Sequence, residues 1–128
     1  MNVKVSTKVY PLRMVAYTHS SVDVTISITN LINEILWLEC DIQMPETLSL
    51  SRNERVFNGR FRFGIINPKE TIEKTIKIYG SVATYPDIYN IKLVVKVFNR
   101  YGERIGSADH RFNIRCIKSL DIENLGTA

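Results

Sequence analysis

A run of strictly alternating apolar and polar residues constrains the fold of this chain more than any other feature. In residues 22–30 (VDVTISITN), valine or isoleucine occupies each even position up to residue 28, and polar residues occupy the odd positions. Successive side chains of an extended strand point to opposite faces, so this pattern predicts a strand with one face on a core and the other in water. No window of the sequence shows helical periodicity over the length that a helix needs.

The same alternation recurs along the chain, and the composition supports it. Further strands are predicted at residues 35–44, 56–63, 71–79 and 89–98, with a last strand that ends near residue 116. Residues 3–9 and 12–17 are interpreted as one edge strand in two pieces, because Pro11 between them cannot donate to a ladder. The 16 isoleucines and 11 valines, against only 4 alanines, favour strands over helices.

The number and spacing of these strands predict the fold class. About seven short strands with turn signals between them are typical of an all-β protein, here an immunoglobulin-like antiparallel β-sandwich. A chain of 128 residues is long enough for one core and too short for two. We therefore expect a single domain at residues 1–118 and a flexible C-terminal tail at residues 119–128. The residues expected in the shared core are Ile26, Ile28, Leu38, Leu93, Val95 and Ile114.

Two residues break the alternation of their strands. Lys74 falls on the apolar parity of residues 71–79, so either a bulge shifts the register or the lysine stem reaches along the sheet to an edge. Ile105 lies on the parity opposite to Phe112, which predicts a bulge between Gly106 and Asp109.

Three short motifs resemble the immunoglobulin-like modules of the CARDB and NEW3 type. Residues 24–30 look like their second strand ending at Asn, and Pro68-Lys69-Glu70 stands where those families have a Pro-Gly-Glu turn. Residues 86–91 (PDIYNI) are similar to their entry into the sixth strand, although Asp87, like Lys69, replaces a glycine of the family. The resemblance implies a tyrosine corner at Tyr89 and an adhesion or spacer role without catalytic residues.

The two cysteines, Cys40 and Cys116, are predicted to be unpaired. In the immunoglobulin strand order, the strands that carry them lie on either side of the strand at residues 89–98. Two strand spacings come to about 9.5 Å, which exceeds the limit of about 7 Å between the Cα atoms of a disulfide.

No constellation of residues indicates catalysis or metal binding. Asp109 and His110 are adjacent on a strand and therefore point to opposite faces, which excludes a hydrogen-bonded acid–base pair. A zinc site needs three or four converging ligands, and neither histidine (His19, His110) belongs to a ligand motif. We expect no enzyme activity, no cofactor and no small-molecule substrate.

Residues 52–63 interleave four arginines with three phenylalanines, and this segment has two interpretations. The composition suits a surface for nucleic acid or an acidic peptide. It also suits an edge strand with Phe61 and Phe63 inward and arginines in water. Trp37, on the polar parity of its strand, is a second exposed candidate. The candidate interaction surface is Trp37, Arg52, Arg55, Arg60 and Arg62.

Two functions from different classes follow. The first is a non-enzymatic interaction module that binds a protein partner or self-associates, through an exposed strand edge or a sheet face. The alternative is a small nucleic-acid-binding β-protein that uses residues 52–63, consistent with the mild net charge of +4.

The sequence carries no apolar stretch that suggests a membrane span. No window approaches the ~18 apolar residues of a membrane helix, and no basic segment followed by an apolar one opens the chain. We expect a cytoplasmic protein if this chain is complete, and a cell-surface protein if it is a module of a longer secreted one.

Overall fold

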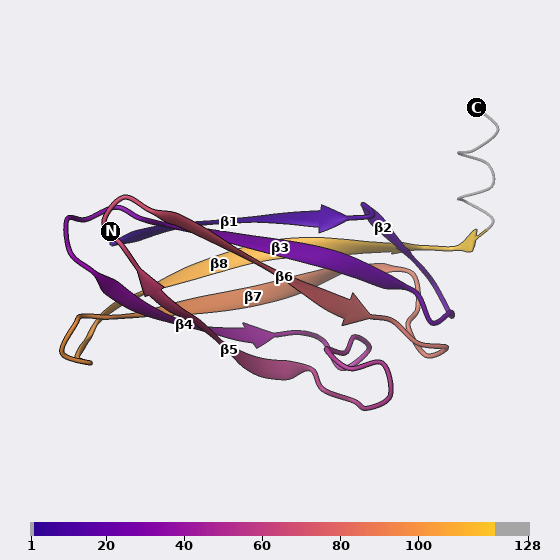
Figure 1. The fold of residues 1–128 in the computed structure, drawn as a ribbon. Helices are drawn as coiled ribbons and strands as arrows, with labels where there is room; N and C mark the ends of the chain where they lie inside the picture. The colour runs from indigo at the N-terminus through magenta and orange to yellow at the C-terminus, as the bar shows by residue number, and fades with distance from the viewer. Residues whose placement is uncertain (1, 120–128) are drawn as a thin grey trace.

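The computed structural model of the chain describes residues 2–119, and its regular elements are eight β-strands (Figure 1). They are β1 (Val3–Tyr10), β2 (Arg13–Val15), β3 (Ser21–Asn30), β4 (Leu36–Gln43), β5 (Asn58–Ile66), β6 (Thr71–Tyr79), β7 (Asp87–Phe98) and β8 (Arg104–Ile117). The tail expected at residues 119–128 lies, from residue 120 onward, outside the described residues.

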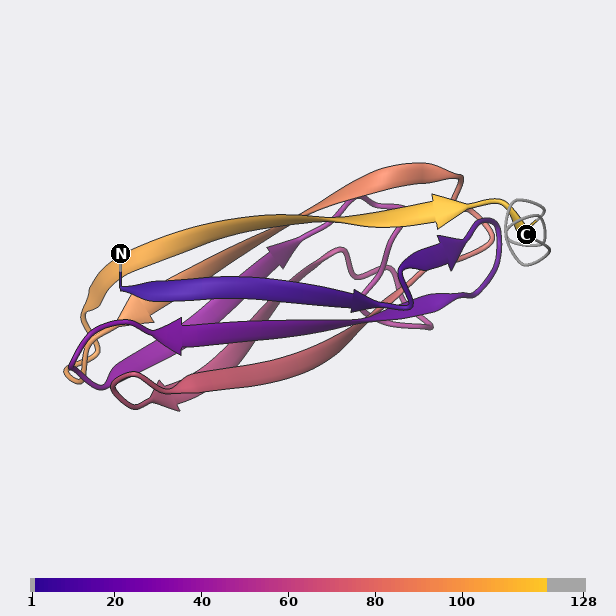
Figure 2. The ribbon, with the colours of Figure 1, turned by 90° about the horizontal axis from the view of Figure 1, so that it is seen from above.

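The strands form two sheets that face each other as the layers of a sandwich (Figures 1 and 2). One sheet has the order β1-β3-β6 and the other the order β2-β8-β7-β4-β5. The predicted all-β, immunoglobulin-like sandwich is therefore confirmed.

The N-terminal edge strand departs from the expectation in two ways. The pieces on either side of Pro11 lie in different sheets, so β1 pairs with β3 whereas β2 pairs with β8. The β2–β8 pair is parallel, so the five-stranded sheet is mixed, and the strands number eight where about seven were expected. Pro11 has no amide hydrogen with which to continue the β1 ladder, so the chain can leave that sheet there.

The core lies between the two sheets and is filled by the apolar parity of each strand. All six core residues predicted from the sequence are fully buried: Ile26, Ile28, Leu38, Leu93, Val95 and Ile114. On β3 each inward residue is buried and each outward one is partly accessible, as the alternation requires. The predicted parity of the core strands is confirmed.

The two residues that break the alternation of their strands, Lys74 and Ile105, are accommodated in different ways. β6 pairs with β3 without a register shift, so Lys74 needs no bulge; its ammonium lies 5.7 Å from the ring centroid of Phe61 on β5. The bulge expected between Gly106 and Asp109 is instead at Ile105, because Val97 pairs with Gly106 and Phe98 pairs with Arg104. A change of parity shows that an extra residue exists, but it does not show where that residue sits.

Two of the family-like motifs have specific geometry. The Tyr89 hydroxyl donates a hydrogen bond to the Tyr85 carbonyl, and Tyr89 is buried, which is the geometry expected of a tyrosine corner. Lys69 has φ 62°, the left-handed conformation that a glycine at this position would adopt without strain. The Lys69 ammonium donates to the Leu31 carbonyl at 2.6 Å, which ties this turn to the β3–β4 loop.

The two thiols are expected to react only after unfolding. Cys40 on β4 and Cys116 on β8 are buried free thiols with β7 between their strands, which confirms the predicted strand order. Burial raises the pKa of Cys40 to about 12 and also raises the pKa of Cys116. Because the thiolate is the reactive form, an aromatic disulfide reagent should find no reactive group in the native protein and two in the unfolded, unreduced protein. Fewer than two groups in the unfolded monomer would contradict the free-thiol assignment.

Candidate interaction face

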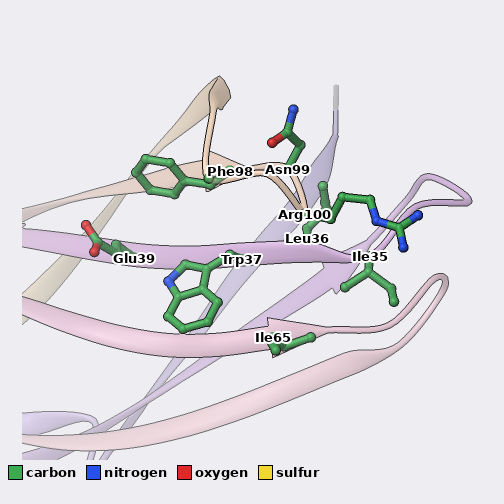
Figure 3. Close-up of a pocket in the computed structure, with 9 residues that line it drawn as sticks. Ile35, Leu36, Trp37, Glu39, Ile65, Phe98, Asn99 and Arg100 are labelled. Atoms are coloured by element: carbon green, nitrogen blue, oxygen red, sulfur yellow. The ribbon is translucent and has the colours of Figure 1, made fainter.

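Trp37 lies on the outer face of the five-stranded sheet, where the alternation of β4 places it. Its neighbours Leu36 and Leu38 are fully buried, so Trp37 points to the other side, and it is 41% exposed. It pairs across the ladders with Ile65 on β5 and with Phe98 on β7. The three side chains form an apolar row across three strands (Figure 3).

This apolar row borders a hollow of about 460 Å³. Ile35 from the β3–β4 loop and Arg100 from the β7–β8 turn lie at its end (Figure 3). A second, more polar hollow of about 570 Å³ shares Ile35 and Arg100 and continues over the loops at this end of the molecule. Volumes of this size are typical of ligand and peptide sites.

Next to the apolar row, the outer face of the five-stranded sheet carries a network of ion pairs. Asp41 accepts from Arg60 at 2.8 Å and from Lys96 at 2.8 Å, and Glu39 lies 3.9 Å from Arg62. The hydrogen bonds from Arg60 and then from Lys96 hold the pKa of Asp41 below its ordinary value. Arg60 and Arg62 are therefore engaged by carboxylates of the same sheet.

The structure separates the five residues proposed as one interaction surface. Trp37, Arg60 and Arg62 share the outer sheet face, whereas Arg52 and Arg55 lie in the β4–β5 loop, beside the β6–β7 loop. The strand predicted at residues 56–63 in fact runs from Asn58 to Ile66.

The edge-strand interpretation is confirmed for residues 58–63, whereas residues 52–57 belong to the β4–β5 loop. Phe61 and Phe63 pack against the core, whereas Arg60 and Arg62 are exposed on the outer face. β5 pairs only with β4, and it is an edge of the five-stranded sheet.

Sequence reasoning missed two members of the apolar row. Phe98, like Trp37, is an aromatic residue on the polar parity of its strand, and this signal could have identified it. Ile65 could not be found in this way, because the ladder shifts register between Leu38 and Glu39 and reverses the parity of β5 after Phe63.

His110 has a structural contact, whereas His19 is exposed. His110 faces β1, and its Nε2 lies 3.0 Å from the Thr7 hydroxyl, whereas Asp109 faces Lys92 on the opposite side. Among residues 2–119, no group of three or more His, Cys, Asp or Glu side chains could hold a metal ion. No helix in this part of the chain is long and apolar enough to cross a membrane.

Comparisons with known proteins find likeness of fold. No protein-family model and no curated protein matches the sequence. Among solved structures, E. coli alpha-2-macroglobulin matches with a TM-score of 0.65 and 14% identity, over 91% of this chain and 7% of that one. The FixG-related protein from Vibrio parahaemolyticus matches with a TM-score of 0.58 and 8% identity, over 91% and 97% of the two chains.

A third similar structure is the non-cellulosomal cohesin from the archaeon Archaeoglobus fulgidus. It matches with a TM-score of 0.50 and 14% identity, over 93% of this chain and 96% of that one. At such identities the likeness is one of fold alone. The class that the strand order and these likenesses define is an immunoglobulin-like β-sandwich protein.

Proposed function

We propose that this chain is a non-enzymatic protein-binding module that uses the outer face of the β2-β8-β7-β4-β5 sheet, centred on Trp37. The observation that carries the proposal is the apolar row of exposed Ile65, exposed Trp37 and half-buried Phe98 beside a hollow of about 460 Å³. Tryptophan is enriched at binding hot spots, and apolar hollows with a few polar groups at the rim are the usual form of a binding site.

The sheet edges are less suited to binding than this face. The edge strand β5 carries the register shift near Phe63, and the edge strand β6 points Lys74 inward, which are both devices that prevent strand addition. On the other side of the sandwich β1 and β8 lie side by side, joined by the Thr7–His110 contact (Figure 2). Of the two binding surfaces expected from the sequence, a strand edge and a sheet face, the sheet face is therefore favoured.

The charge of the face favours a foreign partner over a second copy. Its basic side chains outnumber its acidic ones, and a symmetric dimer would bring the same positive surface together twice. The basic residues are Arg13, Arg60, Arg62, Lys92, Lys96, Arg104, Arg111 and Arg115; the acidic ones are Glu39, Asp41 and Asp109.

The nucleic-acid alternative finds less support in residues 52–63. Arg60 and Arg62 lie beside carboxylates, and the three phenylalanines of this segment pack against the core, where they cannot stack on bases. Among the immunoglobulin-like modules, we propose the CARDB and NEW3 type for this chain. The Tyr89 corner and the left-handed Lys69 at the family's glycine position support this placement.

The Trp37→Ser substitution tests the proposal. Trp37 is the only tryptophan of the chain, so its fluorescence reports binding directly. Peptides selected from a displayed random library on the wild-type protein should shift the Trp37 emission when they bind. Their affinity for the Trp37→Ser variant should fall by about 2 kcal/mol or more, roughly 30-fold, as measured with labelled peptide.

The control is Val82→Ser, which replaces another exposed apolar residue outside this face. Both variants should keep the circular dichroism spectrum of the wild type, and Val82→Ser should keep its affinity. Selected peptides that bind Trp37→Ser as tightly as the wild type would exclude this face. A Trp37-dependent dimer in sedimentation would restore self-association as the function.

A further inference from the structure

Two pairs of like charges stand directly opposite each other on the outer face of the five-stranded sheet. Arg13 of β2 pairs with Arg115 of β8, and Lys92 of β7 pairs with Arg111 of β8. Met14 and Cys116 are buried, so the arginines beside them point to the outer face. Like charges directly opposite each other destabilise a sheet.

Elsewhere in residues 2–119, cross-strand pairs in which both residues are charged join opposite charges. On the other sheet, Asp23 faces Lys77 at 3.3 Å, and Ser27 donates to Glu73 at 3.0 Å. On the same face, Arg60 is paired with Asp41. The two like-charged pairs are therefore an exception among the charged cross-strand pairs of the described residues.

Few acidic side chains of the described residues lie close enough to neutralise these like-charged pairs. Within residues 2–119, Lys92 has one acidic neighbour, Asp109 at 3.8 Å, and Arg13, Arg111 and Arg115 form no ion pair. All three arginines are exposed. An arrangement that costs stability and leaves its charges open to solvent is suited to an external anion.

We propose that this patch binds an acidic segment of a partner protein in an extended conformation. The basic patch comprises Arg13, Lys92, Arg111 and Arg115 with the amides of Asn90 and Asn113 between the charged pairs. It lies apart from the Trp37 hollow, since Lys92 and Phe98 are six residues apart on β7, about 20 Å.

The spacing of the patch fits an extended peptide. Outward residues recur every ~6.6 Å along a strand, so Arg111 and Arg115 lie about 13 Å apart with Asn113 between them. A peptide strand laid along β8 repeats the same spacing. Carboxylates at positions i and i+4 would face the two arginines, and a polar residue at i+2 would face the amides. The planar guanidinium binds a carboxylate through two parallel hydrogen bonds.

A nucleic acid fits the patch less well than an acidic peptide does. Single-strand binders stack bases on aromatic side chains, and the exposed apolar residue that pairs with Arg115 in this patch is the aliphatic Ile88. The charged pairs are separated by a row of amides, which accept and donate hydrogen bonds but do not stack.

The test measures binding of a fluorescein-labelled 20-residue poly-L-glutamate to the full chain by anisotropy at low ionic strength. The double variant Arg111→Gln/Arg115→Gln should bind at least about tenfold more weakly than the wild type. The matched control Arg60→Gln/Arg62→Gln removes the same charge from the same face, but from the ion-paired region, and should bind less than about threefold more weakly.

Thermal unfolding distinguishes a binding role of Arg111 and Arg115 from a structural one. Relief of the like-charge contact should leave the double variant at least as stable as the wild type, whereas the control should be less stable because it loses the Arg60–Asp41 pair. Poly-L-glutamate has no apolar side chain, so its binding is independent of the Trp37 hollow and of the function proposed for it.

Four results would overturn the proposal. These are unchanged binding by the double variant, an equal loss in both variants, a destabilised double variant, or tighter binding of a labelled 20-nucleotide oligothymidylate through the same arginines. The second result would indicate net charge alone, and the fourth would assign the patch to nucleic acid.

Discussion

Replacing Leu93 with alanine is expected to lower the free energy of unfolding by about 2–5 kcal/mol. Leu93 is fully buried at the centre of β7, between Ile42 on β4 and His110 on β8. Strands on both sides of β7 hold the backbone in register, so the core cannot collapse to fill the space. Because natural domains are stable by only about 5–15 kcal/mol, this loss should be evident in urea unfolding followed by circular dichroism.

The neighbouring residue supplies the control for this prediction. Val94 points to the outer face, where it pairs with Asp109 and Asp41. Val94→Ala should cost at most about 1 kcal/mol. A one-residue slip of β7 would exchange the two environments, so equal losses at Leu93 and Val94 would contradict the register of this strand.

The core could be predicted from the sequence because burial on one sheet face imposes a period of two on every long strand. The partners of short elements could not be predicted in this way. The three residues of β2 carry no periodic signal, and their parallel pairing with β8 depends on residues about 100 positions away. The positions of bulges could not be predicted from the sequence either, because one extra residue reverses the parity of a strand without changing its composition.

The residues of the candidate site likewise divide into those that the sequence could predict and those that it could not. Trp37 could be found because an aromatic residue on the polar parity of a strand is unusual. The basic patch could not be found, since the sequence does not reveal that Arg13 lies beside Arg115 or that Lys92 lies beside Arg111. Whether a charged side chain is matched or opposed depends on strand pairing. The segment with the most arginines, residues 52–63, was the more conspicuous, yet its Arg60 and Arg62 lie beside carboxylates of β4.

Replacing Asn30 with alanine is expected to destabilise the protein by about 3 kcal/mol or more, since each buried partner left unsatisfied costs about 1–3 kcal/mol. Asn30 ends β3 and is fully buried. Its side-chain amide donates to the carbonyls of Glu34 at 2.7 Å and Asn67 at 3.2 Å, and its oxygen accepts from the Ile32 amide at 3.1 Å. One side chain therefore satisfies backbone groups of the β3–β4 loop and of the β5–β6 loop.

Two further variants show whether the amide itself is responsible. Asn30→Asp keeps the shape and the acceptor but places a carboxylate against backbone carbonyls, so it should destabilise at least as much as Asn30→Ala. Thr29→Ala removes an outward hydroxyl that bonds to Thr71 at 2.8 Å, and it should cost less than about 1 kcal/mol. Unfolding by urea gives the three values. An Asn30→Asp variant as stable as the wild type would show that the donor is dispensable, and the two loops would then be held by Lys69 and the backbone alone.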